Sequence, residues 1–173
     1  CDGYYQLVPI SDETSSSYTI DSAQILVKRP GLKLVVSGGN VQAPLTKRVK
    51  AAHLTLDVYI ECDTECVWDF DRPAITTNGV TIHPFRLYSN NRTSTKDKWK
   101  STDYIKGSAV DSVLRESRVL RAGQHSLSLS FSARDGGIEY LQFPLTISLG
   151  RIRFRGDTIP LQSLSFGAAL KKH

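Results

Sequence analysis

The chain has 173 residues, of which 40% are hydrophobic and 23% are charged, and its formal net charge at pH 7 is +5. This length predicts one domain with a sizeable core, and the composition is ordinary for a globular fold. The longest apolar runs, such as Leu34–Val36, are too short to span a bilayer, so a membrane-spanning segment is excluded from this sequence.

The N-terminal residues are predicted to be a tether. The stretch 9–23 is polar and rich in serine, a composition that resists burial, although an ordinary exposed loop is the alternative. The apolar stretch Tyr4–Val8 before it is a candidate strand. We therefore divide the chain into residues 1–23, an anchor and tether, and residues 24–173, a folded domain.

Alternation of apolar and polar residues predicts strands through the rest of the chain. In the run 53–61 every second residue is apolar, which is typical of a half-buried strand. The same period recurs at 126–133, where the serines are expected to face solvent, and at 141–149. Shorter strands are predicted at Gln24–Arg29, Leu32–Ser37, Val80–Ser89 and Ser163–Leu170.

Turn residues separate these strands. Asn78-Gly79 suits a two-residue hairpin turn, and Asp135–Gly137 suits a tight or bulged one. Pro84 and Pro144 lie inside strand-like runs and indicate edge positions or bulges. About eight strands at this spacing predict an all-β fold, an antiparallel β-sandwich of immunoglobulin- or transthyretin-like type.

One segment has a helical pattern. Ser108–Asp111 is predicted to be a capping box, and Val110, Val113 and Leu114 share one helical face. This short helix is expected to end before Val119, where a strand and a turn follow.

The two internal cysteines are predicted to form a disulfide. Cys62 and Cys66 are four residues apart, a spacing that closes a small loop in an exported protein. A metal site is the rival interpretation, but zinc needs three or four ligands and the four histidines are distant in sequence. We predict no metal and no cofactor.

Three arginines form the first candidate binding site. On a strand, Arg151, Arg153 and Arg155 point to one face. The preceding run buries its odd positions, so Gly150 must host a turn or bulge that turns the arginines outward. The row suits phosphates, an anionic glycan or an acidic partner. A solvated face, partly paired with nearby acidic residues, is the simpler interpretation.

Two further segments are considered as sites. Trp99 between Lys98 and Lys100 suits contact with a sugar ring or a membrane interface, or it covers the core beneath a loop. The acidic segment Asp57–Asp71 has oxygen ligands for calcium but lacks a calcium-loop spacing, so a structural role is expected. Trp68 within it is predicted to be a core residue.

The sequence contains no catalytic motif. It has no nucleophile elbow, no paired metal-binding histidines on a helix and no glycine-rich phosphate loop. Charge is segregated, with a basic block at 22–56 and an acidic block at 57–71, but no basic face with interleaved aromatics indicates nucleic acid. We therefore expect a binding protein and not an enzyme.

The first residues resemble a processed bacterial lipoprotein. The chain contains no methionine, and it begins with Cys1 followed by Asp2. This resemblance implies a diacylglycerol thioether and an N-acyl chain such as palmitate on Cys1, which would attach the domain to a membrane of the bacterial cell envelope, facing the periplasm. In enterobacterial lipoproteins, Asp after the cysteine implies retention in the inner membrane. The inner and outer membranes both stay open.

A second resemblance is to the small lipoprotein of the type VI secretion membrane complex. Phe85–Tyr88 and Val119–Gln124 look like its strand and turn segments, with a helical stretch between them. The sequence thus predicts a lipid-anchored envelope protein that binds another protein. The alternatives are an assembly component of a secretion complex and a binder of anionic glycan or lipid headgroups.

Overall fold

Antiparallel strands account for most of the chain in the computed structural model, which describes residues 3–9, 23–38, 40–41, 52–71, 73–93 and 100–172. Over these residues the fold is all-β, as the alternation predicts, with one short α-helix and one 3-10 turn. The elements are β1 (Gly3–Pro9), β2 (Ala23–Arg29), β3 (Leu32–Gly38), β4 (Asn40–Val41), β5 (His53–Cys62), β6 (Cys66–Asp69), β7 (Ala74–Thr77), β8 (Val80–Ile82), β9 (Arg86–Thr93), β10 (Lys100–Lys106), α1 (Ser108–Arg115), β11 (Ser117–Leu120), β12 (Gly123–Ser132), η1 (Ala133–Gly136), β13 (Leu145–Ser148), β14 (Arg151–Phe154), β15 (Asp157–Pro160) and β16 (Leu164–Lys172).

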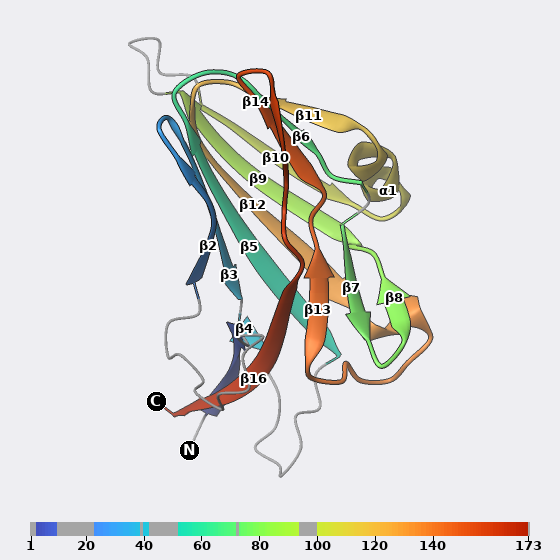
Figure 1. Cartoon of the computed structure of the whole chain (residues 1–173). Helices are drawn as coiled ribbons and strands as arrows, with labels where there is room; N and C mark the ends of the chain where they lie inside the picture. The colour runs from blue at the N-terminus through green and yellow to red at the C-terminus, as the bar shows by residue number, and fades with distance from the viewer. Residues whose placement is uncertain are drawn as a thin grey trace.

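Three sheets form the two layers of a sandwich (Figure 1). Sheet I has the strand order β10-β9-β12-β5-β3-β2 and makes one layer. The facing layer is divided into sheet II, with the order β4-β1-β16-β13-β7-β8, and sheet III, with the order β11-β6-β14-β15. The chain passes between sheets II and III three times, from β6 to β7, from β13 to β14 and from β15 to β16.

The core fills the space between the layers. Alternation along β5 is strict, because each even-numbered residue from Leu54 to Cys62 is buried and each odd-numbered one is exposed or half-buried. The strand that pairs with it, β12, buries Leu127, Leu129 and Phe131 in the same way. The facing layer contributes large buried side chains, among them Trp68, Ile75, Ile147, Ile152 and Phe166. Trp68 is fully buried, as predicted, and its indole N–H donates to the Leu149 carbonyl at 2.7 Å.

Gly150 reverses the side-chain alternation between β13 and β14, as predicted. Leu149 before it is buried, whereas Arg151 after it is exposed and Ile152 is buried. Gly150 has a φ of +81°, a left-handed conformation that glycine adopts at no steric cost. This single residue therefore places the arginines outside and Ile152 and Phe154 inside.

The helix lies at the predicted position, but its cap differs. α1 ends at Arg115 and buries Val110 and Leu114, so the predicted face is confirmed. The N-cap residue is Gly107, which has no side chain, and no side-chain hydrogen bond caps the helix. The predicted capping box at Ser108–Asp111 is therefore wrong.

Several predicted strands have different limits. The run Val80–Ser89 is two strands, β8 and β9, because the chain leaves one sheet for another around Pro84. Residues 135–137 do not form a hairpin turn but belong to the 3-10 turn and its cap. Ser130 and Ser132 are buried and do not face solvent, and Arg86 donates two hydrogen bonds to the Ser130 hydroxyl.

Part of the predicted tether lies in a sheet. β1 pairs along its whole length with β16, so the candidate strand at Tyr4–Val8 is present and belongs to the fold. Residues 10–22 lie outside the described part. Within the described part, no helix is both long and apolar enough to cross a membrane.

Candidate functional site

The predicted arginine row is exposed but paired with acidic residues. Nε of Arg153 lies 2.9 Å and Nε of Arg151 lies 3.4 Å from the same Asp69 oxygen. Arg155 pairs with Asp63 at 2.7 Å. The three guanidinium groups have side-chain exposures of 49–54%, so the row is a solvated face with local pairing, the simpler of the two interpretations.

Asp69 is the centre of this network. Its side chain is only 14% exposed, and it accepts hydrogen bonds from the Ser117 hydroxyl and from both Arg151 and Arg153. The hydrogen bond from Ser117 and those from Arg153 hold the pKa of this carboxyl below its usual range. The carboxylate and its arginines satisfy one another, so this face offers little free charge to a ligand.

The other predicted site residues are placed only in part. Cys1, Lys98 and Trp99 lie outside the described residues. Lys100 lies on β10, opposite Arg92 of β9, but its side chain is not described. The lysine and tryptophan cluster therefore stays a prediction.

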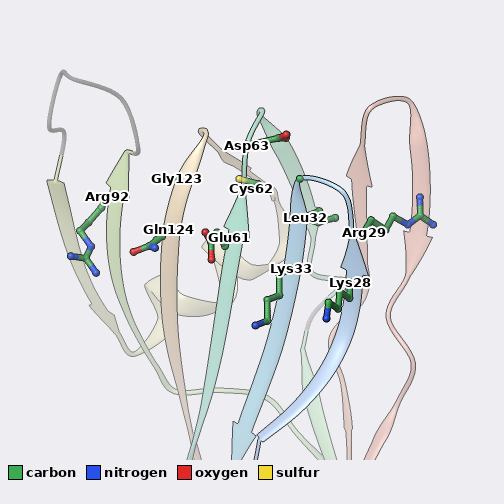
Figure 2. Close-up of a pocket in the computed structure, with 11 residues that line it drawn as sticks. Lys28, Arg29, Leu32, Lys33, Glu61, Cys62, Asp63, Arg92, Gly123 and Gln124 are labelled. Carbon is green, nitrogen blue, oxygen red and sulfur yellow. The ribbon is translucent and has the colours of Figure 1, made fainter.

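A different set of charged residues lies across the outer face of sheet I. The register places Lys28 opposite Lys33, Lys33 opposite Glu61, Glu61 opposite Gln124, and Gln124 opposite Arg92. Directly opposed residues of antiparallel strands point to the same face. Figure 2 shows these five side chains across five adjacent strands. We call them the basic row.

The basic row lines a hollow of about 700 Å³ at one end of sheet I (Figure 2). Arg29 and Asp63 also line it, but each has its own partner, since Arg29 pairs with Asp157 at 3.2 Å and Asp63 pairs with Arg155. Among the described residues, no carboxylate lies within ion-pair distance of the three cations of the basic row. The three cations of the basic row outnumber its one carboxylate, Glu61, so the hollow has a net positive charge.

The pKa of Tyr59 depends on charged residues of the basic row. Its pKa is raised, because burial disfavours the charged phenolate and because Glu61 adds negative charge, whereas Arg92 acts in the opposite direction. Glu61 and Arg92 therefore both act on the same small region of the outer face.

Both internal cysteines are free thiols, so the predicted disulfide is absent, and Cys62 lines the hollow. β5 ends at Cys62 in sheet I and β6 begins at Cys66 in sheet III, so the three residues between them carry the chain from one layer to the other. After this crossing the two thiols are near enough to act on each other's pKa, but they are not joined by a covalent bond. Both thiols are buried.

A buried polar cluster surrounds Cys62. The His125 ring lies 2.8 Å from Asn91 Oδ1 and 2.7 Å from the Arg121 carbonyl oxygen. The hydrogen bond from Cys66 and the nearby His125 lower the pKa of Cys62 to about 5, and the pKa of Cys66 is raised in turn. Each polar atom named here has a partner, so the cluster ties the end of sheet I to sheet III.

The sequence contained only part of this signal. Lys28 and Lys33 lie on two predicted strands, whereas Arg92 lies beyond the end of the predicted strand Val80–Ser89. The alignment of the three residues depends on the strand order β2-β3-β5-β12-β9, in which strands that are neighbours in the sheet are distant in the sequence. Neither the charge blocks nor local spacing indicate that pairing. A comparison with models of known protein families finds no match, and a comparison with curated proteins finds none either.

Proposed function

We propose that the protein is a non-catalytic binding domain that holds an anionic ligand in the hollow of the basic row. The observation that carries the proposal is the set of three cations, Lys28, Lys33 and Arg92, that face one hollow without an acidic partner among the described residues. The arginine row, in contrast, already has Asp63 and Asp69 as counter-ions.

Geometry supports a ligand with several negative charges. Adjacent strands are about 4.8 Å apart, so Lys33 and Arg92, three strands apart, are separated by about 14 Å across the sheet. A single small anion would contact only one end of the row. An extended polyanion would contact both ends, and its attraction would decrease with salt because the site is open to solvent.

The cellular setting stays a prediction. A lipid on Cys1, attachment to the cell envelope and a role in a secretion complex all concern residues or partners outside the described structure. The proposal for the basic row does not depend on them, because it rests on residues 28–124 alone.

The test compares two triple variants that remove the same charge. The first is Lys28→Gln with Lys33→Gln and Arg92→Gln, and the second is Arg151→Gln with Arg153→Gln and Arg155→Gln. Each is titrated with polygalacturonate and with polyglutamate at low and at high salt. We expect the first variant to lose at least tenfold in affinity for the polyanions that the wild type binds, because each lost contact weakens binding by about 1 kcal/mol.

The second variant is the charge-matched control, and we expect it to lose less affinity than the first, because only the loss of Arg155 affects the hollow, by leaving Asp63 without its partner. Thermal melting of both variants checks that they fold, since the exchanged side chains are exposed. Equal binding by the first variant and the wild type would refute the proposal. Loss of binding in the second variant alone would move the site to the arginine row.

A further inference from the structure

The outer face of sheet I continues from the basic row to a pair of exposed tyrosines. Tyr88 on β9 lies opposite Tyr104 on β10, and the two rings meet edge to face with centroids 6.5 Å apart. They are 40% and 55% exposed, which is high for large aromatic side chains. Tyr88 is four residues from Arg92 on the same strand, so the two share a face about 13 Å apart.

Short polar side chains fill the face between the tyrosines and the basic row. Asn90 lies opposite Ser126, and Ser128 lies opposite both Tyr88 and Asp57. The Ser128 hydroxyl donates to Asp57 at 2.6 Å, and the Asn90, Ser126 and Asp57 side chains are exposed. The face thus offers hydroxyl, amide and carboxylate groups in a flat array, with aromatic rings at one side and cations at the end.

This composition does not suit a protein partner. The buried centre of a protein interface is apolar and is depleted in serine and aspartate, whereas these types lie between the tyrosines and the basic row. The apolar residues of the same face, Tyr59, Val35 and the exposed Ile25, lie to one side of this part, on β5, β3 and β2. A hydroxyl-rich ligand matches it better, because its hydroxyl groups exchange hydrogen bonds with short polar side chains. The apolar faces of its rings pack on tyrosine, whose ring is apolar and whose hydroxyl stays in water.

We infer that the ligand is an acidic polysaccharide, which lies on the outer face of sheet I from the Tyr88–Tyr104 pair to the basic row. Its sugar rings pack on the tyrosines, and its carboxylates pair with Lys33 and Arg92. This inference rests on the proposed function, because it names the class of anion that the hollow binds. It adds two contact residues that carry no charge.

The experiment separates the tyrosines from the cations. The full chain, Tyr88→Ala, Tyr104→Ala, and the ring-preserving variants Tyr88→Phe and Tyr104→Phe are titrated with polygalacturonate, alginate and hyaluronan. Methyl-esterified polygalacturonate provides the same backbone without charge, and polyglutamate provides the charge without sugar. Tyr140→Ala is the matched control, because Tyr140 is 38% exposed and lies after η1, outside sheet I.

We expect each alanine variant to bind at least one acidic polysaccharide three- to tenfold more weakly than the wild type does. Binding of polyglutamate, and binding by the phenylalanine variants and by Tyr140→Ala, should stay within twofold of wild type. Methyl esterification should abolish binding. Thermal melting of each variant confirms that it folds.

Three results would overturn the inference. If the tyrosine variants bind acidic polysaccharide normally while the variant of the basic row does not, the proposed function stands and the sugar-binding face is wrong. If the tyrosine variants lose as much affinity for polyglutamate as for acidic polysaccharide, the face binds an acidic protein segment. If the wild type binds none of the polyanions, both proposals fail.

Discussion

At the residue scale, the same chemical type has different roles according to its neighbours. Arg153 is held by Asp69, and Arg155 is held by Asp63, so both arginines complete ion pairs of the fold. Arg92 is also exposed, but it lies opposite Gln124 on the neighbouring strand and makes no ion pair with a described carboxylate. Whether an arginine is available to a ligand is therefore decided by its tertiary partner and not by its position on a strand.

The first residue-scale prediction concerns Asp69. Because its pKa is lowered in the folded state, the ionised carboxylate stabilises the fold above the pKa of the unfolded chain, about 4, and this stabilisation is lost as the pH falls towards the lower folded pKa. Asp69→Asn should therefore lower the free energy of unfolding by about 1–2 kcal/mol at pH 7, because charge-assisted hydrogen bonds to a covered group are lost.

Urea unfolding of the wild type and of Asp69→Asn between pH 7 and pH 3 measures this effect. The difference between them should be constant down to about pH 5 and then narrow. Asp63→Asn is the control, because Asp63 is half exposed and its surface ion pair contributes less than about 1 kcal/mol. A difference for Asp69→Asn that does not change with pH would contradict the role given to its charge.

At the element scale, one glycine decides which side chains of β14 face the core. A Cβ atom at position 150 would overlap the backbone carbonyl oxygens of Asp69 and Phe70, so the strand passes too close to β6 for any side chain. Gly156, in the turn between β14 and β15, has nearly the same φ, +80°, but has no atom within 4 Å of that Cβ position. The two glycines thus share a conformation and differ in available space.

This pair allows a controlled measurement. Gly156→Ala should lower the free energy of unfolding by about 1 kcal/mol, the cost of a left-handed conformation with a Cβ atom. Gly150→Ala should lower it by about 3 kcal/mol, because the overlap with the neighbouring backbone adds to that cost. Chemical denaturation of both variants provides the comparison, and equal losses would show that close packing at Gly150 contributes nothing.

The sequence predicted the elements better than it predicted their partners. Strict alternation at residues 53–61 marked β5, and the change of phase at Gly150 placed Ile152 inside and the arginines outside, because both features depend on local periodicity alone. The Gly107 cap was missed because glycine is a weaker N-cap signal than the neighbouring Ser108. The predicted disulfide is wrong, because spacing does not reveal that Cys62 and Cys66 belong to different layers.

At the scale of the whole molecule, folding mixes charge blocks that are separate in the sequence. Asp63 and Asp69 belong to the acidic block 57–71, yet they pair with arginines more than 80 residues further along the chain. Meanwhile Lys28 and Lys33 from the basic block line up with Arg92 across sheet I. Asp63 and Asp69 therefore pair with the arginines that follow Gly150, whereas Lys28, Lys33 and Arg92 outnumber Glu61 at the end of sheet I.

The divided layer has a consequence for how the molecule unfolds. Sheets II and III are joined by three chain crossings, which lie between Asp69 and Ala74, at Gly150, and between Pro160 and Leu164. Both sheets pack on sheet I through one core. Unfolding of sheet II or of sheet III would therefore disrupt strands of the other sheet. We expect the whole domain to unfold in a single cooperative transition. Calorimetric and van't Hoff enthalpies should agree, and amide protons of β6 and β7 should exchange with the same free energy. Two separate melting steps would contradict this coupling. If the three sheets unfold together, a ligand bound to sheet I raises the melting temperature of all of them.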